Sequence, residues 1–305
     1  MTAPRVSIGM PVFNGARHLS AAIEAIRGQT FHDFELVICD NASTDATSKI
    51  ARRVAHEDAR IRHVRHATNI GVVENFRFAS SVGNGEYFIW AAHDDLWAPR
   101  FLETTVGLLD AGDALLAFTG FDNIDDEGRR VAQFPMRWST VWQGSKFEQL
   151  DTFVRAEPTR TQKANFIYGL MRRRTVETCR EFFRHDAYAG ADIVHLCALL
   201  CRGEFVSSDD TLFHYRVRNA SPRPPGSGLS YLANRMFGKT PGHSGNLATA
   251  VMKNHRQYRE LRRILLRDAP LPLHERVVLA ATATASEWWR LTTAFPAAIS
   301  RELFA

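Results

Sequence analysis

Two adjacent carboxylates, Asp94 and Asp95, are the residues of this sequence best placed to bind a cation. They follow the apolar run 86–90, which predicts a buried strand, and they precede Pro99, which suits the first turn of a helix. We therefore expect both acids at the carboxyl end of a strand, before a helix over residues 100–109. Ligands of open α/β sheets bind at that edge, and oxygen ligands there suit Mg²⁺ or Mn²⁺ together with substrate phosphates.

Short polar clusters also follow the earlier apolar runs of the chain. Each cluster alone fits a capped turn, since Asn, Asp, Ser and Thr start turns and helices. Asp40 has a second interpretation, because a carboxylate can accept a hydrogen bond from a nucleobase N–H or a ribose hydroxyl. The clusters are Pro11, Phe13 and Asn14 after residues 6–10, Asp40, Asn41 and Asp45 after residues 34–39, and Asn69 after residues 61–65.

Strands and helices alternate through the first third of the chain. Such alternation implies right-handed βαβ crossovers and a mostly parallel sheet, so the predicted fold class is α/β and doubly wound. The expected strands are residues 6–10, 34–39, 61–65 and 86–90, and the expected helices are 19–26, 44–56, 72–81 and 100–109.

Beyond residue 114 the alternation weakens, which predicts an α+β extension followed by a small helical tail. Residues 122–128 suit a hairpin turn whose acids we expect to be solvated. The other expected elements are strands at 115–118 and 167–171, a strand pair over 204–216, helices at 176–183, 193–201, 246–266 and 273–290, and a loop at 219–230.

The order of the four strand-end clusters resembles that of the family 2 glycosyltransferases. The resemblance covers roughly residues 5–220 and implies a GT-A fold, which binds a nucleotide-sugar in its amino-terminal half and an acceptor in its carboxy-terminal half. It therefore implies that residues 1–113 form the nucleotide-sugar-binding half and residues 114–220 the acceptor-binding and catalytic half of the same domain. Residues 221–305 would form a loop and the helical tail.

The resemblance also implies roles for the strand-end residues. Asp40 would recognise the base, Asp95 would ligate Mg²⁺ or Mn²⁺, and Asp94 would contact the metal or the ribose. Many family members have a further acid where this chain has Ala92 and His93, so His93 is either a ligand contact or a turn residue. The implied nucleotide-sugar pocket consists of Pro11, Phe13, Asn14, Asp40, Asn41, Asp45, Asn69 and Asp94.

In the family, an acid in the second half of the chain serves as general base. Asp192 matches the position of that acid, because it lies before an apolar helix. A helix cap is the alternative role for Asp192, and Asp186 and Glu181 are rival candidates for the base.

Arg216 and Arg218 resemble the family segment that closes over the diphosphate. The two arginines are separated by one residue, so on an extended chain both can face the same side. Their guanidinium groups suit phosphate oxygens. A solvated basic loop is also consistent with this segment. Tyr168 and Gly169 lie where the acceptor side begins in the family, or simply at a strand end.

Charge is unevenly distributed, with a net −4 over residues 1–150 and +9 over residues 151–305. The basic half favours phosphate or a lipid head group, and no nucleic-acid motif accompanies it, so no nucleic-acid partner is expected. The sequence shows neither a leader peptide nor a run of about 18 apolar residues. We therefore expect a cytoplasmic chain, and the basic half is compatible with peripheral association at the inner face of the membrane.

The four cysteines lack metal spacing and predict buried, reduced thiols.

The resemblance thus implies an inverting glycosyltransferase that uses a nucleoside-diphosphate sugar and a hydroxyl acceptor such as a lipid-linked glycan. Two other classes stay open. A nucleotide-sugar-forming nucleotidyltransferase usually has a glycine-rich, basic loop after the first strand, which residues 9–15 lack. A catalytically inactive nucleotide- or carbohydrate-binding homologue is the second. The carrier (UDP, dTDP or GDP), the linkage and the oligomeric state are not specified by the sequence.

Overall fold

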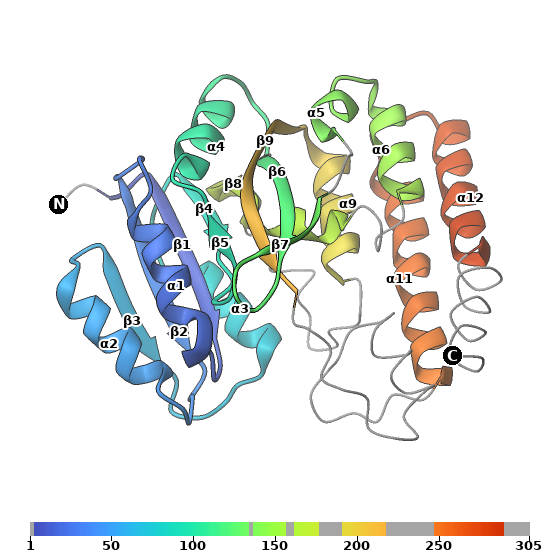
Figure 1. Cartoon of the computed structure of the whole chain (residues 1–305). Coiled ribbons are helices and arrows are strands. Elements are labelled where there is room, and N and C mark those ends of the chain that lie inside the picture. Colours follow the sequence, from blue (N-terminus) through green and yellow to red (C-terminus); the bar gives the residue numbers. More distant parts are fainter. Residues whose placement is uncertain (1–2, 134–136, 157–161, 177–190, 218–246, 290–305) are drawn as a thin grey trace. The chain divides into compact units, whose positions relative to one another are not determined.

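The computed structural model describes residues 3–133, 137–156, 162–176, 191–217 and 247–289 (Figure 1). The chain divides into two compact units. The first unit comprises Met1–Trp142, Asn165–Asp186 and Gly203–Arg218, and it carries most of the candidate site residues. The second unit comprises Gln143–Ala164, Ala187–Arg202 and Asn219–Ala305.

The described part of the first unit contains a nine-stranded sheet in the order β3-β2-β1-β4-β8-β6-β9-β5, with β7 paired to β6. Parallel ladders join β3, β2, β1 and β4, and a further parallel ladder joins β6 to β9. Most of the paired residues of the sheet belong to these parallel ladders. The predicted α/β fold with a mostly parallel sheet is confirmed. The strands are β1 (Val6–Val12), β2 (Phe34–Asp40), β3 (Ile61–Arg65), β4 (Tyr87–Trp90), β5 (Leu96–Trp97), β6 (Leu116–Ile124), β7 (Arg130–Gln133), β8 (Leu170–Arg172) and β9 (Phe205–Arg216).

Hydrophobic patterning explains these elements. Every residue of β1 is buried, as is typical of a parallel strand covered on both faces. The next helix buries residues at helical spacing, namely Leu19, Ala22, Ile23 and Ile26. Because β1 to β4 are mutually parallel, the loops that leave their carboxyl ends share one edge of the sheet. The helices between and after these strands are α1 (Ala16–Arg27), α2 (Thr47–Glu57), α3 (Val72–Ser81) and α4 (Phe101–Asp110).

Two predictions beyond residue 114 are wrong in detail. Residues 167–171 do not form one strand, because the 3₁₀ helix η1 (Lys163–Tyr168) comes first and only β8 is extended. Over the predicted range 204–216, residues Phe205–Arg216 form a single strand, β9, instead of a strand pair. The polar residues Asp209 and Asp210 form an irregularity in its pairing with β6.

The second unit is helical in its described part, and residues 247–289 form helices as predicted for the tail. Ser145 and Glu148 form a capping box at the start of α6 (Lys146–Arg155). Helix α11 (Leu247–Asp268) packs against α9 (Ala191–Arg202) and α12 (Leu273–Trp289), and α12 also packs against α6. None of the described helices combines the length and apolar character needed to cross a membrane. The predicted loop at 219–230 and most of the predicted helix at 176–183 lie outside the described residues.

The described cysteines agree with the expectation of reduced thiols. Cys39, Cys197 and Cys201 are buried and form no disulfide. Cys179 lies outside the described residues.

Candidate active site

The acidic turn that follows β4 holds Asp95 in the interior of the first unit. Asp95 is fully buried, and its Oδ1 atom accepts a 2.8 Å hydrogen bond from the backbone N–H of Arg216. Its Oδ2 atom has no hydrogen-bond partner within the described part of the chain. Burial, together with the negative charge of Asp94, raises the pKa of Asp95 well above its usual value. A buried carboxylate oxygen that lacks a donor is the kind of group that a bound cation stabilises.

Arg216, the last residue of β9, stabilises the acidic turn by hydrogen bonds. Its Nε atom donates to the backbone oxygen of Asp94 at 2.7 Å, and a terminal nitrogen donates to the backbone oxygen of Asp125. Arg216 is only 5% exposed. Two of its nitrogens therefore bind main-chain carbonyls, and its contact with a diphosphate stays a prediction. Arg218, its predicted partner, lies outside the described residues.

The turn between β6 and β7 contacts the start of α1. Gly128 adopts φ +82° there, which confirms the predicted hairpin turn. The Asp126 carboxylate lies 3.2 Å from a guanidinium nitrogen of Arg17 and 3.3 Å from Nε2 of His18. Burial and the charges of Arg216 and Arg17 lower the pKa of His18. The sequence gives no signal for Asp126 or His18, because only the tertiary fold brings them together.

Two acids of the same hairpin are buried, so the expectation that its acids are solvated is wrong for them. Asp122 is 1% exposed and lies 2.6 Å from Nδ1 of His214 and 2.5 Å from Nε of Arg130. Asp125 is 5% exposed, and its carboxylate accepts from the backbone N–H of Arg129 at 2.9 Å and from its Nε at 2.8 Å. These carboxylates stabilise the hairpin that carries Asp126.

The loops that follow β1 and β2 are joined by residues predicted to line the nucleotide pocket. Oδ1 of Asn14 accepts a 2.8 Å hydrogen bond from the N–H of Thr44. Asp45 accepts from the N–H of Ala16 at 3.1 Å and from the N–H of Thr47 at 2.9 Å. Asp45 thereby caps the first turns of both α1 and α2, where backbone donors lack helical partners.

Three further residues near this edge differ in exposure. Pro11 is buried within β1, opposite Cys39 of β2, whereas Phe13 is 44% exposed. His93 packs against Gly15, because a Cβ atom at position 15 would lie only 2.4 Å from the His93 ring. In this structure His93 therefore acts as a packing residue of the acidic turn, while Phe13 presents an aromatic ring to solvent.

Asp40, the predicted base-recognition residue, is fully buried at the end of β2. Its Oδ1 accepts from the N–H of Ser43 at 2.9 Å, and its Oδ2 accepts from the Ser48 hydroxyl. Arg65 Nε and His63 Nε2 lie 3.4 and 3.5 Å from Oδ2. Burial raises the pKa of Asp40, but hydrogen bonds from Ser43 and Ser48 outweigh it and leave the pKa below its usual value. Because the chain's own donors engage both oxygens, base recognition by Asp40 stays a prediction.

Asn41 and Asn69, two predicted pocket residues, contact each other. The Asn41 Nδ2 atom donates to Oδ1 of Asn69 at 2.9 Å, and its Oδ1 accepts from the N–H of Ile70 at 2.8 Å. Asn69 Oδ1 also accepts from the N–H of Gly71 at 2.8 Å. These bonds join the end of β2 to the loop that leads into α3, so the structure brings together the polar loops after β1, β2 and β3.

Tyr168 and Gly169 pack within the first unit. A Cβ atom at position 169 would lie 2.9 Å from the backbone oxygen of Ala117, so glycine permits close approach to β6. The Tyr168 ring lies 5.9 Å from the Phe213 ring, centroid to centroid. These contacts explain both residues by packing, and their role toward an acceptor stays a prediction.

Asp192 lies in the first turn of α9, in the second unit. Its Oδ1 atom accepts a 2.8 Å hydrogen bond from the N–H of Ile193. Burial raises the pKa of Asp192 above the usual value, despite that bond. A carboxylate with a raised pKa is a stronger proton acceptor, which suits a general base. The rivals Asp186 and Glu181 lie outside the described residues.

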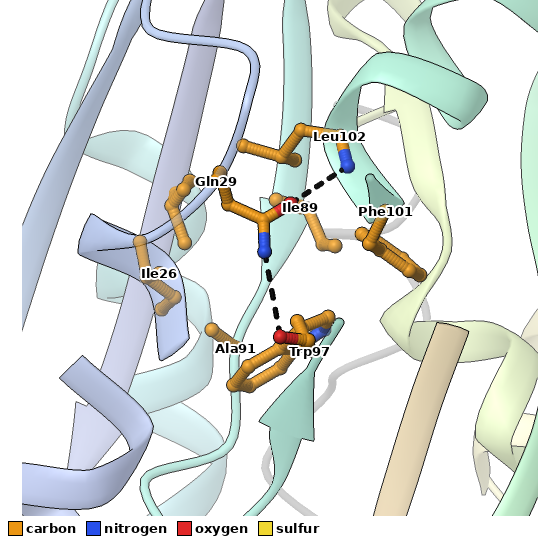
Figure 2. A pocket seen from close by; sticks show the side chains of 8 residues that line it. Ile26, Gln29, Ile89, Ala91, Trp97, Phe101 and Leu102 are labelled. Carbon is orange, nitrogen blue, oxygen red and sulfur yellow. Dashed lines mark hydrogen bonds between the residues drawn. The ribbon is translucent and has the colours of Figure 1, made fainter. Parts of the chain in front are cut away.

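Gln29 anchors the segment that follows the acidic turn. Figure 2 shows its side chain directed between Trp97 and Leu102. Its Nε2 donates to the backbone oxygen of Ala98 at 2.9 Å, and its Oε1 accepts from the N–H of Leu102 at 2.9 Å. The pocket around it has no charged lining and is best described as packing space. It is lined by Ile8, Ile26, Gln29, Ile89, Ala91, Trp97, Phe101 and Leu102.

Substituting Gln29 with leucine is expected to lower the free energy of unfolding by about 2 kcal/mol, because the buried N–H of Leu102 loses its partner and the half-buried oxygen of Ala98 keeps only its bond from the N–H of Phe101. Urea denaturation measures this loss. The matched control is Thr30→Val, since exposed Thr30 also bonds to this segment, at Pro99. Its cost is expected to stay within about 0.5 kcal/mol. Equal losses in the two variants would contradict the anchoring role of Gln29.

Asp95 and Asp94 are the residues of this unit that fit a divalent ion. The fit rests on Oδ2 of Asp95, which is buried without a donor. No cluster of three or more His, Cys, Asp or Glu side chains suited to a metal occurs within the described ranges. Mg²⁺ is commonly held by one or two carboxylates, with water and substrate phosphates completing its coordination. The acidic turn therefore suits an ion that arrives with a phosphate-bearing ligand.

Comparisons with known proteins agree with this geometry. Residues 7–174 match the family model described as Glycosyl transferase family 2. The putative glycosyltransferase EpsE of Bacillus subtilis (strain 168) is 31% identical over 170 residues, which are 53% of this chain and 60% of EpsE. The chain thus spans less than two thirds of that relative.

Solved structures show a similar fold. S. aureus TarS 1–349 in complex with UDP-GlcNAc has a TM-score of 0.63 and 14% identity, covering 95% of this chain and 76% of TarS 1–349. The mannosyltransferase PcManGT from Pyrobaculum calidifontis, in complex with GDP-Man and Mn2+, has a TM-score of 0.50 and 18% identity. It covers 100% of this chain and 88% of PcManGT.

The matched residues include β1 to β4, the polar loops at their carboxyl ends and the acidic turn with Asp95. The match extends over more than half of the chain, and the sheet corresponds to that of TarS. This chain has the GT-A fold and belongs to glycosyltransferase family 2.

Proposed function

We propose that this protein is an inverting glycosyltransferase that moves a sugar from a nucleoside-diphosphate sugar to an acceptor hydroxyl. The observation that carries the proposal is the buried, unpartnered Oδ2 atom of Asp95 at the carboxyl end of a parallel strand in a family 2 chain. The ligands named for the neighbours support the donor class, since TarS is described with UDP-GlcNAc and PcManGT with GDP-Man and Mn2+.

Asp95 and Asp94 would hold Mg²⁺ or Mn²⁺ in this proposal. The ion would supply positive charge that stabilises the diphosphate as it leaves. The raised pKa of Asp95 is consistent with a carboxylate whose ionised form needs such a cation. Arg216 holds the turn through the carbonyl of Asp94 and, with Arg218, is proposed to contribute positive charge near the diphosphate.

The strand-end loops would form the nucleotide pocket. Phe13 offers an exposed ring for stacking, and Asp40 is the proposed base-recognition group. The hydrogen bonds of Asn14, Asp45, Asn41 and Asn69 keep the loops in one arrangement, so these residues support the pocket as much as they line it. Pro11, buried in β1, is proposed to fix the start of the first loop.

Asp192 is the proposed general base. It would take the proton from the acceptor hydroxyl as that oxygen forms a bond to the anomeric carbon, while the bond from this carbon to the diphosphate oxygen breaks. The nucleoside diphosphate leaves with the bonding electron pair, and the single displacement inverts the anomeric centre. Tyr168 and Gly169 are proposed to border the acceptor.

The acceptor is proposed to be a glycan hydroxyl, carried on a lipid, in polysaccharide or glycolipid biosynthesis. The excess positive charge of residues 151–305 supports a lipid-linked acceptor at the cytoplasmic face of a membrane. Such an acceptor would require the protein to work at the membrane surface.

The pH dependence of the rate follows from the raised pKa of Asp192. The base must be ionised, so kcat/KM is expected to fall as the pH decreases through the pKa of Asp192, which burial raises above the usual value of an aspartate. The decline should therefore begin at a higher pH than for an unperturbed aspartate. A pH–rate profile between pH 4 and 9 measures it, and a rate that stays constant down to pH 4 would contradict the assignment.

A thermal-shift panel tests the donor proposal. We expect one of UDP, dTDP and GDP to raise the melting temperature, and Mn²⁺ to increase that shift, because the ion and the diphosphate would bind together. Absence of a shift with all three nucleotides, with and without Mn²⁺, would contradict the proposed function.

A further inference from the structure

Helix α12 presents an apolar stripe on its outer face. Leu273, Val277, Val278 and Trp288 are 68%, 51%, 48% and 63% exposed. Between Val277 and Trp288 the single charged residue is Glu287, which is buried. The stripe continues for more than three helical turns, or about 22 Å. Exposed apolar patches of this kind mark surfaces that bind another molecule.

Helix α11 presents a basic stripe on its exposed face. The side chains of Arg259, Arg263 and Arg267 are 61%, 65% and 70% exposed. Arg259 and Arg263 lie 3.6 and 3.7 Å from Glu260, and Arg267 donates to Asp268 at 3.2 Å. The side chains of these two acids are only 26% and 25% exposed. Residues 254–268 contain five arginines and two acids. Arg262 pairs with Glu287 of α12, which leaves four arginines against Glu260 and Asp268 and therefore an excess of positive charge.

The two stripes border each other within the second unit. Glu287 of α12 bonds to Nδ1 of His255 at 2.8 Å and to Arg262 at 2.6 Å, and Arg276 donates to the backbone oxygen of Leu266 at 3.1 Å. Figure 1 shows α11 and α12 running side by side.

The contacts of α12 with α6 and α11 do not involve the exposed valines of the apolar stripe. Thr282 contacts Asp151 and Arg155 of α6 on another side of α12. The exposed side chains of Val277 and Val278 therefore face away from both neighbours. Leu266, 42% exposed on α11, lies at the boundary between the two stripes.

We propose that the outer faces of α11 and α12 form a docking surface for an anionic lipid bilayer, with the apolar stripe of α12 in the interface and the arginines of α11 against lipid phosphates. Apolar burial and attraction to anionic lipid act together in this mode of binding. A second copy of the chain fits less well, because pairing the same faces would bring two basic stripes together. The inference is independent of the sugar-transfer reaction.

Vesicle sedimentation of the full chain, without nucleotide, tests the proposal. We expect binding to vesicles of phosphatidylcholine with phosphatidylglycerol, and little binding to phosphatidylcholine alone. The double variant Arg259→Gln, Arg263→Gln is expected to bind the anionic vesicles about 25-fold more weakly, at about fivefold for each arginine. Its matched control, Arg53→Gln with Arg62→Gln, removes the same charge from exposed arginines of the first unit. That control should change affinity by about twofold.

A second pair of variants tests the apolar stripe. Val277→Ser with Val278→Ser is expected to weaken binding about tenfold with an unchanged melting temperature, because both side chains are exposed. The control is Val131→Ser, an exposed valine of β7. Three results would overturn the proposal: equal binding to neutral and anionic vesicles, equal effects of variants and controls, or a dimer in light scattering that Val277→Ser, Val278→Ser dissociates.

Discussion

Replacing Asp95 with asparagine is expected to lower turnover about 10³-fold while the protein stays folded. The asparagine keeps an Oδ1 atom for the 2.8 Å hydrogen bond from the N–H of Arg216. Its Nδ2 group replaces the unpartnered Oδ2 atom and cannot ligate a cation. The diphosphate would then have to leave without the charge stabilisation that the proposal assigns to this position.

The same substitution is expected to leave the free energy of unfolding at pH 7 unchanged or higher. Burial and Asp94 raise the pKa of Asp95, so the folded state binds this proton more tightly than the unfolded state does. For a carboxyl with a raised pKa, stability is lost as the pH increases through that pKa. A neutral asparagine avoids the loss, so the variant should be stable and inactive, as is typical of a residue retained for function.

Melting temperatures and a binding readout test this pair of expectations. For Asp95→Asn we expect no decrease in the melting temperature of the free protein and no Mn²⁺-dependent increase with nucleoside diphosphate. The contrasting control is Asp58→Asn, because hydrogen bonding to Arg60 lowers the pKa of Asp58 to about 2, so its charge stabilises the fold at neutral pH. That control should melt earlier and keep its turnover per folded molecule. Retained turnover and retained Mn²⁺ response in Asp95→Asn would contradict the metal assignment.

Replacing Asp192 with asparagine is expected to lower turnover by about 10³-fold or more, while the affinity for nucleoside diphosphate stays near wild type. The substitution removes the proton acceptor and preserves both the side-chain shape and the oxygen that accepts from the N–H of Ile193. Binding of the donor, which the proposal assigns to the strand-end loops, should be unaffected.

This variant also separates catalysis from helix capping. Asparagine is about as good as aspartate near a helix start, so a purely structural Asp192 would tolerate the change. Steady-state kinetics with calorimetric titration of the nucleoside diphosphate distinguish the two roles. Retained turnover would exclude Asp192 as the base, and a parallel loss of nucleotide affinity would indicate a disturbed fold.

Local sequence signals predicted the first third of the chain closely. The strand at residues 61–65 and the helix at residues 72–81 have the predicted bounds, because hydrophobic period and turn residues are both local. The same signals identified the acidic turn between β4 and α4. The apolar run at residues 86–90 before the turn and Pro99 after it are both local signals.

Longer-range features could not be predicted this way. Strand β8 inserts between β4 and β6, and no local pattern encodes that order. The polar run Asp209 to Thr211 resembles a turn, yet pairing with β6 keeps it within one irregular strand. The two bonds from the side chain of Arg216 to backbone carbonyls of Asp94 and Asp125 also depend on distant segments, and no local pattern predicts them. In each case tertiary partners distant in sequence decide the outcome.

The most direct test of the central proposal is to identify the phosphate product released from nucleotide-sugars. The full chain would be incubated with Mn²⁺, a lipid extract as acceptor, and UDP-, dTDP- or GDP-sugars in turn. We predict release of a nucleoside diphosphate from one of these donors, transfer of the sugar with an inverted anomeric configuration, and loss of both in Asp95→Asn and Asp192→Asn. Release of pyrophosphate, or no release of nucleoside diphosphate from any donor, would contradict the account.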